Sequence, residues 1–213
     1  SGKSNFVGQL MVNLAKDSDW KFAVASFENQ PEIHISRMME IYTGKRFFEG
    51  KDRMSEAERD QAFKWVNEHF LFLDTNGEEP STLDSILDRA RVAVKRMGVR
   101  GLIIDPYNEL DHTKRKDGVS ETEYVSVFLT QMRKFARDNQ IHIWLVAHPA
   151  KLMKDNKGVY PVPDGYSVSG SAHFFNKADN IIAVHRDTSN PQAATEVHVQ
   201  KVRSRWLGRR GVA

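Results

Sequence analysis

The chain has 213 residues, 40% of them hydrophobic and 28% charged, a balance that fits a soluble globular protein of one large α/β domain or two small ones. It contains no cysteine, which excludes a disulfide framework and a cysteine-based zinc site, and no apolar run reaches the roughly 18 residues that span a bilayer. The net charge of +3 permits nucleic-acid binding but does not by itself indicate it.

In the first half of the chain, amphipathic helices alternate with apolar strands. Apolar residues recur at helical spacing in several segments, and turn or capping residues separate them. The predicted helices cover residues 4–16, 30–43, 55–70 and a segment that Thr82 caps and Gly98 ends. The predicted strands cover residues 22–27 and 71–73.

The second half of the chain continues the alternation. Strands are predicted over 101–105, 141–147, 181–184 and 195–202, with a long helix over 121–139. This order predicts an α/β fold with a mostly parallel, twisted sheet and helices on both faces. The polar, glycine-containing segments 111–120 and 151–171 remain without an assigned element, and long loops of this kind are usually functional or disordered.

The N-terminal residues Ser1, Gly2, Lys3 and Ser4 match the end of a phosphate-binding loop, G-x-x-x-x-G-K-[ST]. In such a loop the glycine lets backbone N–H groups wrap phosphate oxygens, the lysine reaches the outer phosphates, and the serine hydroxyl ligates Mg²⁺. We expect the preceding strand and the first half of the loop to be missing from the chain. Taken alone, so short a motif can also arise by chance.

Two carboxylates follow predicted strands. Asp105 ends the strand 101–105, as the acid of a Walker B strand does, and Glu28 follows the strand 22–27. Because the carboxyl ends of parallel strands share one edge, Asp105 is predicted to hold Mg²⁺ and Glu28 to activate the attacking water. An acidic turn explains Asp105 as well, and an acid ahead of the helix that Pro31 starts explains Glu28.

Further polar residues lie at later strand ends. His148 follows the strand 141–147 and could sense a γ-phosphate, although a lone histidine is more often structural. Lys201 and Arg203 share one face of the last predicted strand, where they could be solvated or could act on a neighbouring subunit's nucleotide. Arg186, at the end of the preceding strand, is another candidate cation for the nucleotide.

Taken together, these residues resemble the DnaB family of replicative helicases, and within it the phage primase-helicase and Twinkle-like branch. The resemblance covers nearly the whole chain, and His148 favours that branch because bacterial members carry glutamine there. The matching segments, in the family's order and spacing, are 1–4, 26–28, 104–105, 146–148, 167–171, 178–182 and 201–203.

The resemblance implies that residues 1–213 form a RecA-like P-loop NTPase domain that uses ATP or another NTP with Mg²⁺ to translocate on single-stranded DNA. Glu28 would be the catalytic base, His148 the sensor, and Lys201 with Arg203 would act in trans on the next subunit's γ-phosphate. The unassigned loops would face DNA in a central channel, with five cations meeting the phosphate backbone. Those predicted DNA-binding cations are Lys114, Arg115, Lys151, Lys154 and Lys157.

The same resemblance implies a homo-oligomer, a hexameric ring in the family, a possible primase partner and no membrane partner. The location would be the cytoplasm of a bacterial or phage-infected cell, or the mitochondrial matrix for a Twinkle-like protein. Two alternatives stay open: another RecA-like DNA-dependent ATPase, such as a plasmid replication helicase or a recombinase-like protein, and a non-catalytic DNA-binding or assembly fragment.

Overall fold

The computed structural model describes residues 2–28, 30–74, 81–110, 119–150, 152–154, 160–168, 172–187, 190 and 192–213. The elements of these ranges follow one another as α1 (Lys3–Ser18), β1 (Phe22–Ser26), α2 (Pro31–Thr43), α3 (Glu56–His69), β2 (Phe70–Phe72), α4 (Leu83–Met97), β3 (Gly101–Asp105), a 3-10 helix (Tyr107–Glu109), α5 (Glu121–Asp138), β4 (His142–Leu145), α6 (Ala172–Lys177), β5 (Asn180–His185), β6 (Glu196–Val202) and β7 (Gly211–Val212).

The chain forms two compact units. The parallel-sheet unit comprises Ser4–Lys114 and Phe135–Val146, and the antiparallel-sheet unit comprises Ser1–Lys3, Arg115–Lys134 and Ala147–Ala213. Each unit contains one of the two sheets, and each is described by itself.

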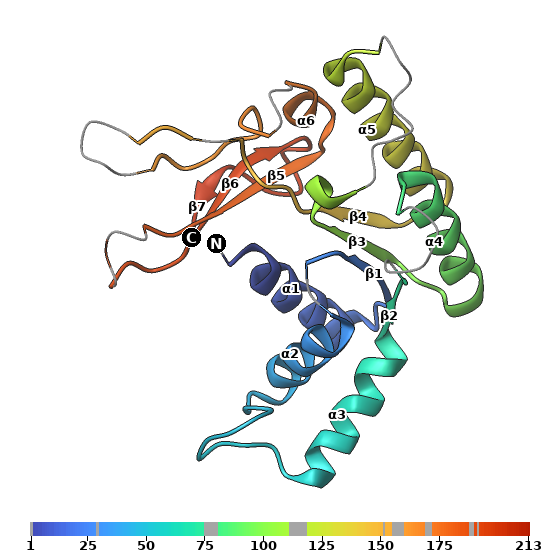
Figure 1. Ribbon diagram of the computed structural model, residues 1–213, viewed down its shortest axis with the longest axis vertical. Helices are drawn as coiled ribbons and strands as arrows, with labels where there is room; N and C mark the ends of the chain where they lie inside the picture. The colour runs from blue at the N-terminus through green and yellow to red at the C-terminus, as the bar shows by residue number, and fades with distance from the viewer. Residues whose placement is uncertain are drawn as a thin grey trace. The chain divides into compact units, whose positions relative to one another are not determined.

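The parallel-sheet unit has four strands in the order β2-β1-β3-β4, and every neighbouring pair is parallel. Parallel neighbours need crossover connections, and helices supply them here. In Figure 1, α1, α2 and α3 lie on one side of this sheet and α4 on the other. The register pairs Ser26 with Asp105, so the last residues of β1 and β3 lie side by side.

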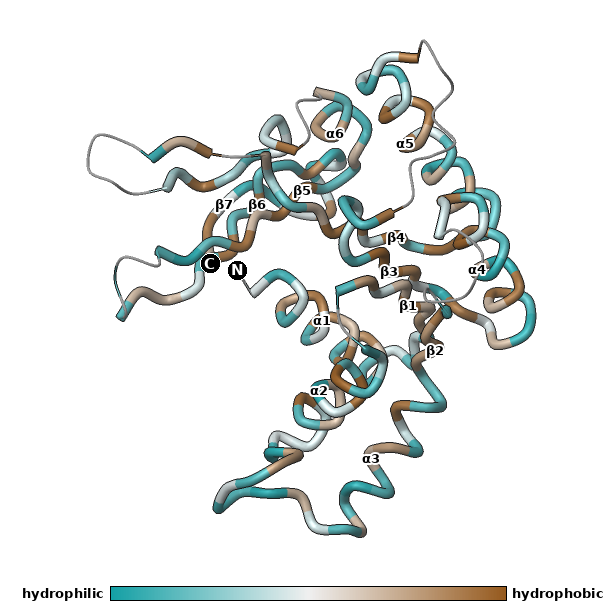
Figure 2. The backbone as a smooth tube through the Cα atoms, in the orientation of Figure 1, coloured by the Kyte–Doolittle hydropathy of each residue, from teal (hydrophilic) through white to brown (hydrophobic). Residues whose placement is uncertain are grey.

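One hydrophobic cluster of this unit lies between the sheet and α1, α2 and α3. Phe22 and Val24 of β1 and Ile103 of β3 point to the same face because they are alternate or register-matched positions. They pack with the buried methionines Met38 and Met39 of α2, among others. Figure 2 shows the strands as predominantly hydrophobic and α3 as largely hydrophilic.

Gly101 begins β3 where no side chain fits. A Cβ atom there would lie 2.4 Å from Cδ1 of Phe22 and 3.0 Å from Cζ3 of Trp144. We expect Gly101→Ala to lower the free energy of unfolding by about 1–3 kcal/mol, because the two rings must shift in a packed core. Urea denaturation measures this. Gly211→Ala, where a Cβ would contact nothing within 4 Å, is the control, and equal effects of the two changes would contradict the steric explanation.

Local signals placed most element ends correctly. Thr82 caps α4, and Gly98 ends it in the left-handed conformation at φ 69°. Ser55 and Glu58 form a capping box at the start of α3. The strand predicted over residues 141–147 is shorter in the structure, where β4 covers only His142–Leu145.

The antiparallel-sheet unit contains β5, β6 and β7 in that order, paired antiparallel. The predicted strands 181–184 and 195–202 are therefore present as β5 and β6, but they belong to this antiparallel sheet and not to the parallel sheet. The pattern did not predict the short helix α6, whose Lys177 Nζ donates to the Ser126 carbonyl of α5 at 2.6 Å.

Candidate functional site

The start of α1 has the features of an anion-binding helix end. Gly2 adopts φ 81°, a left-handed conformation that glycine accepts without strain, and α1 begins at the next residue, Lys3. The first turn of α1 carries no acidic residue. The free backbone N–H groups and the helix dipole make this end of α1 positive, and no carboxylate of the first turn neutralises it. Such a helix end suits a phosphate.

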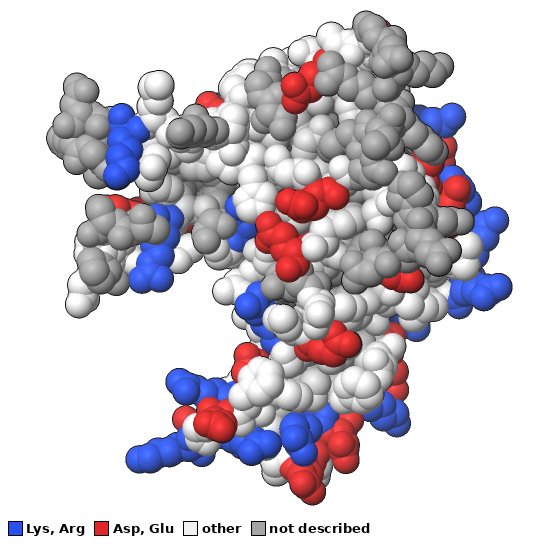
Figure 3. Space-filling model, in the orientation of Figure 1, with Lys and Arg blue, Asp and Glu red and all other residues white. Residues whose placement is uncertain are grey.

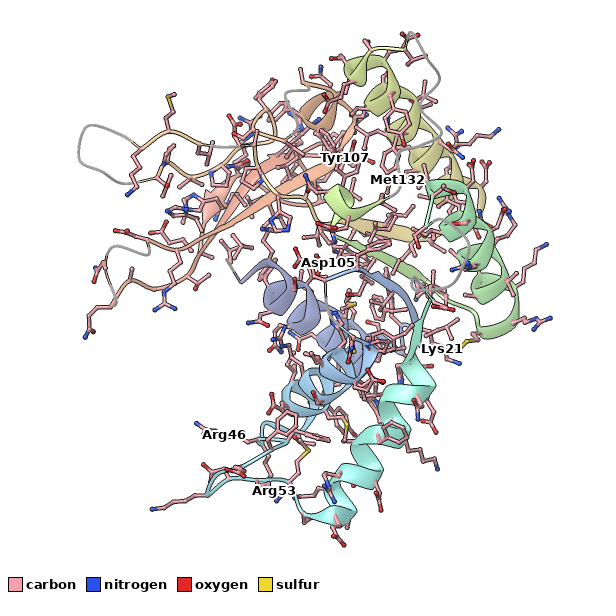
Figure 4. The ribbon with its side chains drawn as sticks, viewed as in Figure 1. Lys21, Arg46, Arg53, Asp105, Tyr107 and Met132 are labelled. Atoms are coloured by element: carbon pink, nitrogen blue, oxygen red, sulfur yellow. The ribbon has the colours of Figure 1, made fainter. Side chains whose placement is uncertain are left out.

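Ser4 and Asp105 line one pocket of the parallel-sheet unit. The pocket lies beside α1, with Val24 and Ile103 of the sheet and residues of α2 completing its wall. Asp105 is only 6% exposed at the end of β3, and Figure 4 shows it next to the first turns of α1. The structure thus brings together the two residues that were predicted to ligate Mg²⁺.

A hydroxyl and a carboxylate are oxygen donors of the kind that Mg²⁺ prefers. Among the described residues there is no group of three or more His, Cys, Asp or Glu side chains that could form a complete metal cage. Mg²⁺ is usually bound by one or two protein oxygens together with water and substrate phosphates. Ser4 and Asp105 therefore fit a magnesium ion that arrives with a nucleotide.

Glu28 lies in the bend that follows β1, with an exposed side chain. The residue before it, Phe27, donates its backbone N–H to the Asp105 carbonyl at 3.0 Å. This bond extends the pairing of β1 with β3 beyond Ser26, so Glu28 leaves the sheet at the same edge as Asp105. The predicted common edge of the two carboxylates is therefore present.

Sequence reasoning missed His34, which lines the same pocket as Ser4 and Asp105. His34 is 8% exposed, and its Nε2 lies 2.6 Å from Oγ of Ser26. Burial lowers the pKa of His34, the Asp105 carboxylate opposes this by raising it, and Arg37 lowers it further. The sequence did carry a signal that His34 is buried, because His34 and Met38 are four residues apart and lie on the same, buried side of α2.

Lys201 and Arg203 lie together in the antiparallel-sheet unit, at the C-terminal end of α6. Lys201 Nζ donates to the carbonyls of Phe175 and Asn176, at 2.5 and 3.3 Å. Arg203 Nε lies 2.6 Å from Oδ1 of Asp179, and its Nη2 donates to carbonyls at the end of α6. Cations at this end of a helix satisfy free carbonyls and the negative end of the dipole. Burial, aided by Arg203, lowers the pKa of Lys201.

Other predicted residues belong to the antiparallel-sheet unit as well. Lys3 begins α1, His148 follows β4 by three residues, and Arg186 is exposed directly after β5. Of the predicted DNA-binding residues, Lys154 is exposed, with its Nζ 5.1 Å from the ring centre of Tyr160. The predicted residues Ser1, Lys114, Arg115, Lys151 and Lys157 lie outside the described residues.

Basic and acidic side chains lie side by side on part of the parallel-sheet unit. In the face drawn in Figure 3, basic and acidic side chains mix over α2, α3 and the loop between them. Lys45 and Glu58, for example, form an ion pair at 2.6 Å. Within the described ranges, no helix is long and apolar enough to cross a membrane.

Comparison with known proteins identifies relatives over the entire chain. The sequence model of the DnaB-like helicase C-terminal domain matches residues 1–212. The Twinkle homolog protein, chloroplastic/mitochondrial, of Arabidopsis thaliana is 40% identical over 221 residues, a match that covers 100% of this chain and 31% of that protein. The chain thus spans about a third of the length of this curated relative.

Two solved structures have the same fold. One is described as an ATPase domain and the other as a DnaB-like replicative helicase with its interactions with primase, and each gives a TM-score of 0.74 at 19% identity. Each match covers 100% of this chain, and the shares of the two solved chains are 76% and 53%. The predicted α/β, RecA-like fold is confirmed.

Proposed function

The chain belongs to the DnaB-like helicase C-terminal domain family, and from this premise we propose that it is the NTP-hydrolysing motor of a replicative DNA helicase. The observation that carries the proposal is the shared pocket of Ser4 and Asp105 beside the start of α1. Residues 1–213 would form one ATPase domain, and its nucleotide would be ATP or another NTP.

The predicted residues would supply the parts that phosphoryl transfer needs. Lys3 would bind the outer phosphates, and Ser4 and Asp105 would hold Mg²⁺, which neutralises charge on the phosphate oxygens when bound. Glu28 would accept a proton from the water that attacks the γ-phosphorus, while the bond to the β-phosphate oxygen breaks. His148, which follows β4, would sense the γ-phosphate. Arg186, which follows β5, would contact the nucleotide.

Lys201 and Arg203 would act on the nucleotide of the adjacent subunit. We expect Arg203→Ala to lower NTP hydrolysis by the assembled protein roughly 1,000-fold, the magnitude typical of a lost arginine finger. Phosphate release at protein concentrations above and below assembly measures this. Arg205→Ala, which removes an exposed arginine that stacks 4.8 Å over the Trp206 ring, is the matched control.

Arg203 also binds the end of α6, so its removal has a structural effect that must be separated from a catalytic one. Thermal melting of the unassembled variant reports the structural part. An equal loss of hydrolysis in unassembled and assembled protein would contradict the in-trans role.

Single-stranded DNA is the proposed track. Lys154 and Tyr160 place a cation beside an aromatic ring, a pairing that suits phosphate contact together with base stacking. Lys114, Arg115, Lys151 and Lys157 would add phosphate contacts. Such binding is sequence-neutral and weakens steeply with salt.

The proposed assembly is a homo-hexameric ring, with a primase as a possible partner. The location would be the compartment that holds the replicated DNA: bacterial or phage-infected cytoplasm, or the mitochondrial matrix.

The most informative experiment is NTP hydrolysis as a function of protein concentration, with and without single-stranded DNA. The proposal expects DNA to stimulate turnover, and turnover per subunit to rise steeply as rings form. Electron microscopy distinguishes rings from the helical filaments of a recombinase-like protein. Absence of any affinity for ATP or Mg²⁺-ADP would instead indicate a non-catalytic DNA-binding or assembly module.

A further inference from the structure

The hydrogen bond between Ser26 and His34 joins the two ends of the segment that carries Glu28. Ser26 is the last residue of β1, and His34 lies in the first turns of α2. Their side chains meet at 2.6 Å across the loop that connects these two elements. Both partners are held by rigid structure, because β1 pairs with two strands and α2 packs into the core.

Backbone bonds hold parts of the same segment. Phe27 N–H donates to the Asp105 carbonyl at 3.0 Å, and the N–H groups of Ile33 and His34 donate to the Gln30 carbonyl at 3.1 and 3.4 Å. The first bond fixes the start of the segment to β3, and the other two form the first turn of α2. The side-chain bond between Ser26 and His34 connects these two parts directly.

Further groups surround the His34 imidazole. The Phe72 ring centre lies 6.0 Å from that of His34, and Asp105 and Arg37 line the same pocket. With 8% exposure, His34 would leave an unsatisfied polar group if its bond to Ser26 were lost. The buried bond therefore favours one arrangement of the loop over others.

We propose that His34 is a positioning residue for NTP hydrolysis, which holds the Glu28 segment against the Asp105 edge of the sheet through its hydrogen bond to Ser26. This inference rests on the proposed function, since it assigns Glu28 the role of base. Exposed side chains on short loops lose catalytic geometry easily, and a misplacement of about 1 Å can cost roughly 100-fold in rate.

The test compares His34→Ala, Ser26→Ala and the double variant in the assembled protein. We expect each single change to lower kcat roughly 10- to 100-fold with little change in the KM for NTP. The double variant should lose no more than either single variant, because both remove the same bond. His34→Gln, whose amide can reach the position of Nε2, should recover a large part of kcat.

A matched control is His69→Ala in the same unit. His69 is also 8% exposed and hydrogen-bonded, to the Trp65 carbonyl and to Asp19, but it does not line the pocket. Its loss should lower the melting temperature and leave kcat unchanged. If His34→Ala and His69→Ala affect kcat equally, or if His34→Gln recovers nothing, the positioning role is wrong.

Amide hydrogen exchange provides a readout that does not need turnover. His34→Ala and Ser26→Ala should speed exchange in the segment between β1 and α2, with no matching change in α3. Unchanged exchange there would overturn the inference. Should the wild-type protein fail to hydrolyse NTP, the proposed function fails, and exchange alone still decides whether the bond holds the segment.

Discussion

Replacing Lys3 with alanine is expected to abolish NTP hydrolysis and to leave much of the DNA binding intact. Lys3 begins α1 directly after the left-handed Gly2, the place that the lysine of a phosphate-binding loop takes. Removing a preorganised cation from developing phosphate charge should lower kcat roughly 1,000-fold or more.

Phosphate release measures the turnover of Lys3→Ala, and fluorescence anisotropy with a labelled single strand measures its DNA affinity. The control is Lys16→Ala, at the other end of α1, where Nζ donates to the Tyr42 carbonyl. That change removes the same charge from the same helix and should leave hydrolysis unaltered. Wild-type turnover in Lys3→Ala would disprove the assignment of residues 1–4 to a phosphate-binding loop.

Glu28→Gln is expected to eliminate most hydrolysis while the protein still binds nucleotide. The amide keeps the size of the side chain but cannot accept the proton of the attacking water, which should lower kcat by roughly 100- to 10,000-fold. Nucleotide affinity should change little, because Ser4 and Asp105 remain. Rapid-mixing turnover together with binding of a labelled nucleotide separates the two effects.

Glu32→Gln is the matched control for Glu28→Gln, since Glu32 is an exposed acid in the first turn of α2. A general loss of negative charge at this edge of the sheet would affect both variants. If Glu28→Gln retains turnover, or loses nucleotide affinity in parallel with turnover, Glu28 is not the base.

Local sequence signals predicted most of the parallel-sheet unit. Gly98 ends α4 and Ser55 begins α3 because capping chemistry depends on only a few neighbouring residues. The strand 101–105 was visible as an apolar run. In contrast, the antiparallel pairing of β5 with β6 depends on contacts that no local pattern encodes, and α6 has only 6 residues, too few for a periodic signal.

For the candidate site, too, some features could be predicted from the sequence and others could not. Asp105 and Glu28 could be predicted because parallel strands end at one edge, and the register of Ser26 with Asp105 agrees with that rule. The bond between His34 and Ser26 could not be predicted, because a helix residue and a strand residue meet only after folding. The bonds from Lys201 and Arg203 to α6 were likewise invisible without α6 itself.

Those bonds at the end of α6 have a consequence for how a ring could work. A guanidinium has a fixed fork of donors, so the Arg203 that faces Asp179 at 2.6 Å cannot present the same N–H groups to a phosphate. Serving a neighbour's nucleotide would require Arg203 to exchange an intrachain partner for an interchain one. Each such exchange would break the bonds from Arg203 to the carbonyls of α6. Nucleotide binding at the site of one subunit would therefore weaken the end of α6 in the next subunit.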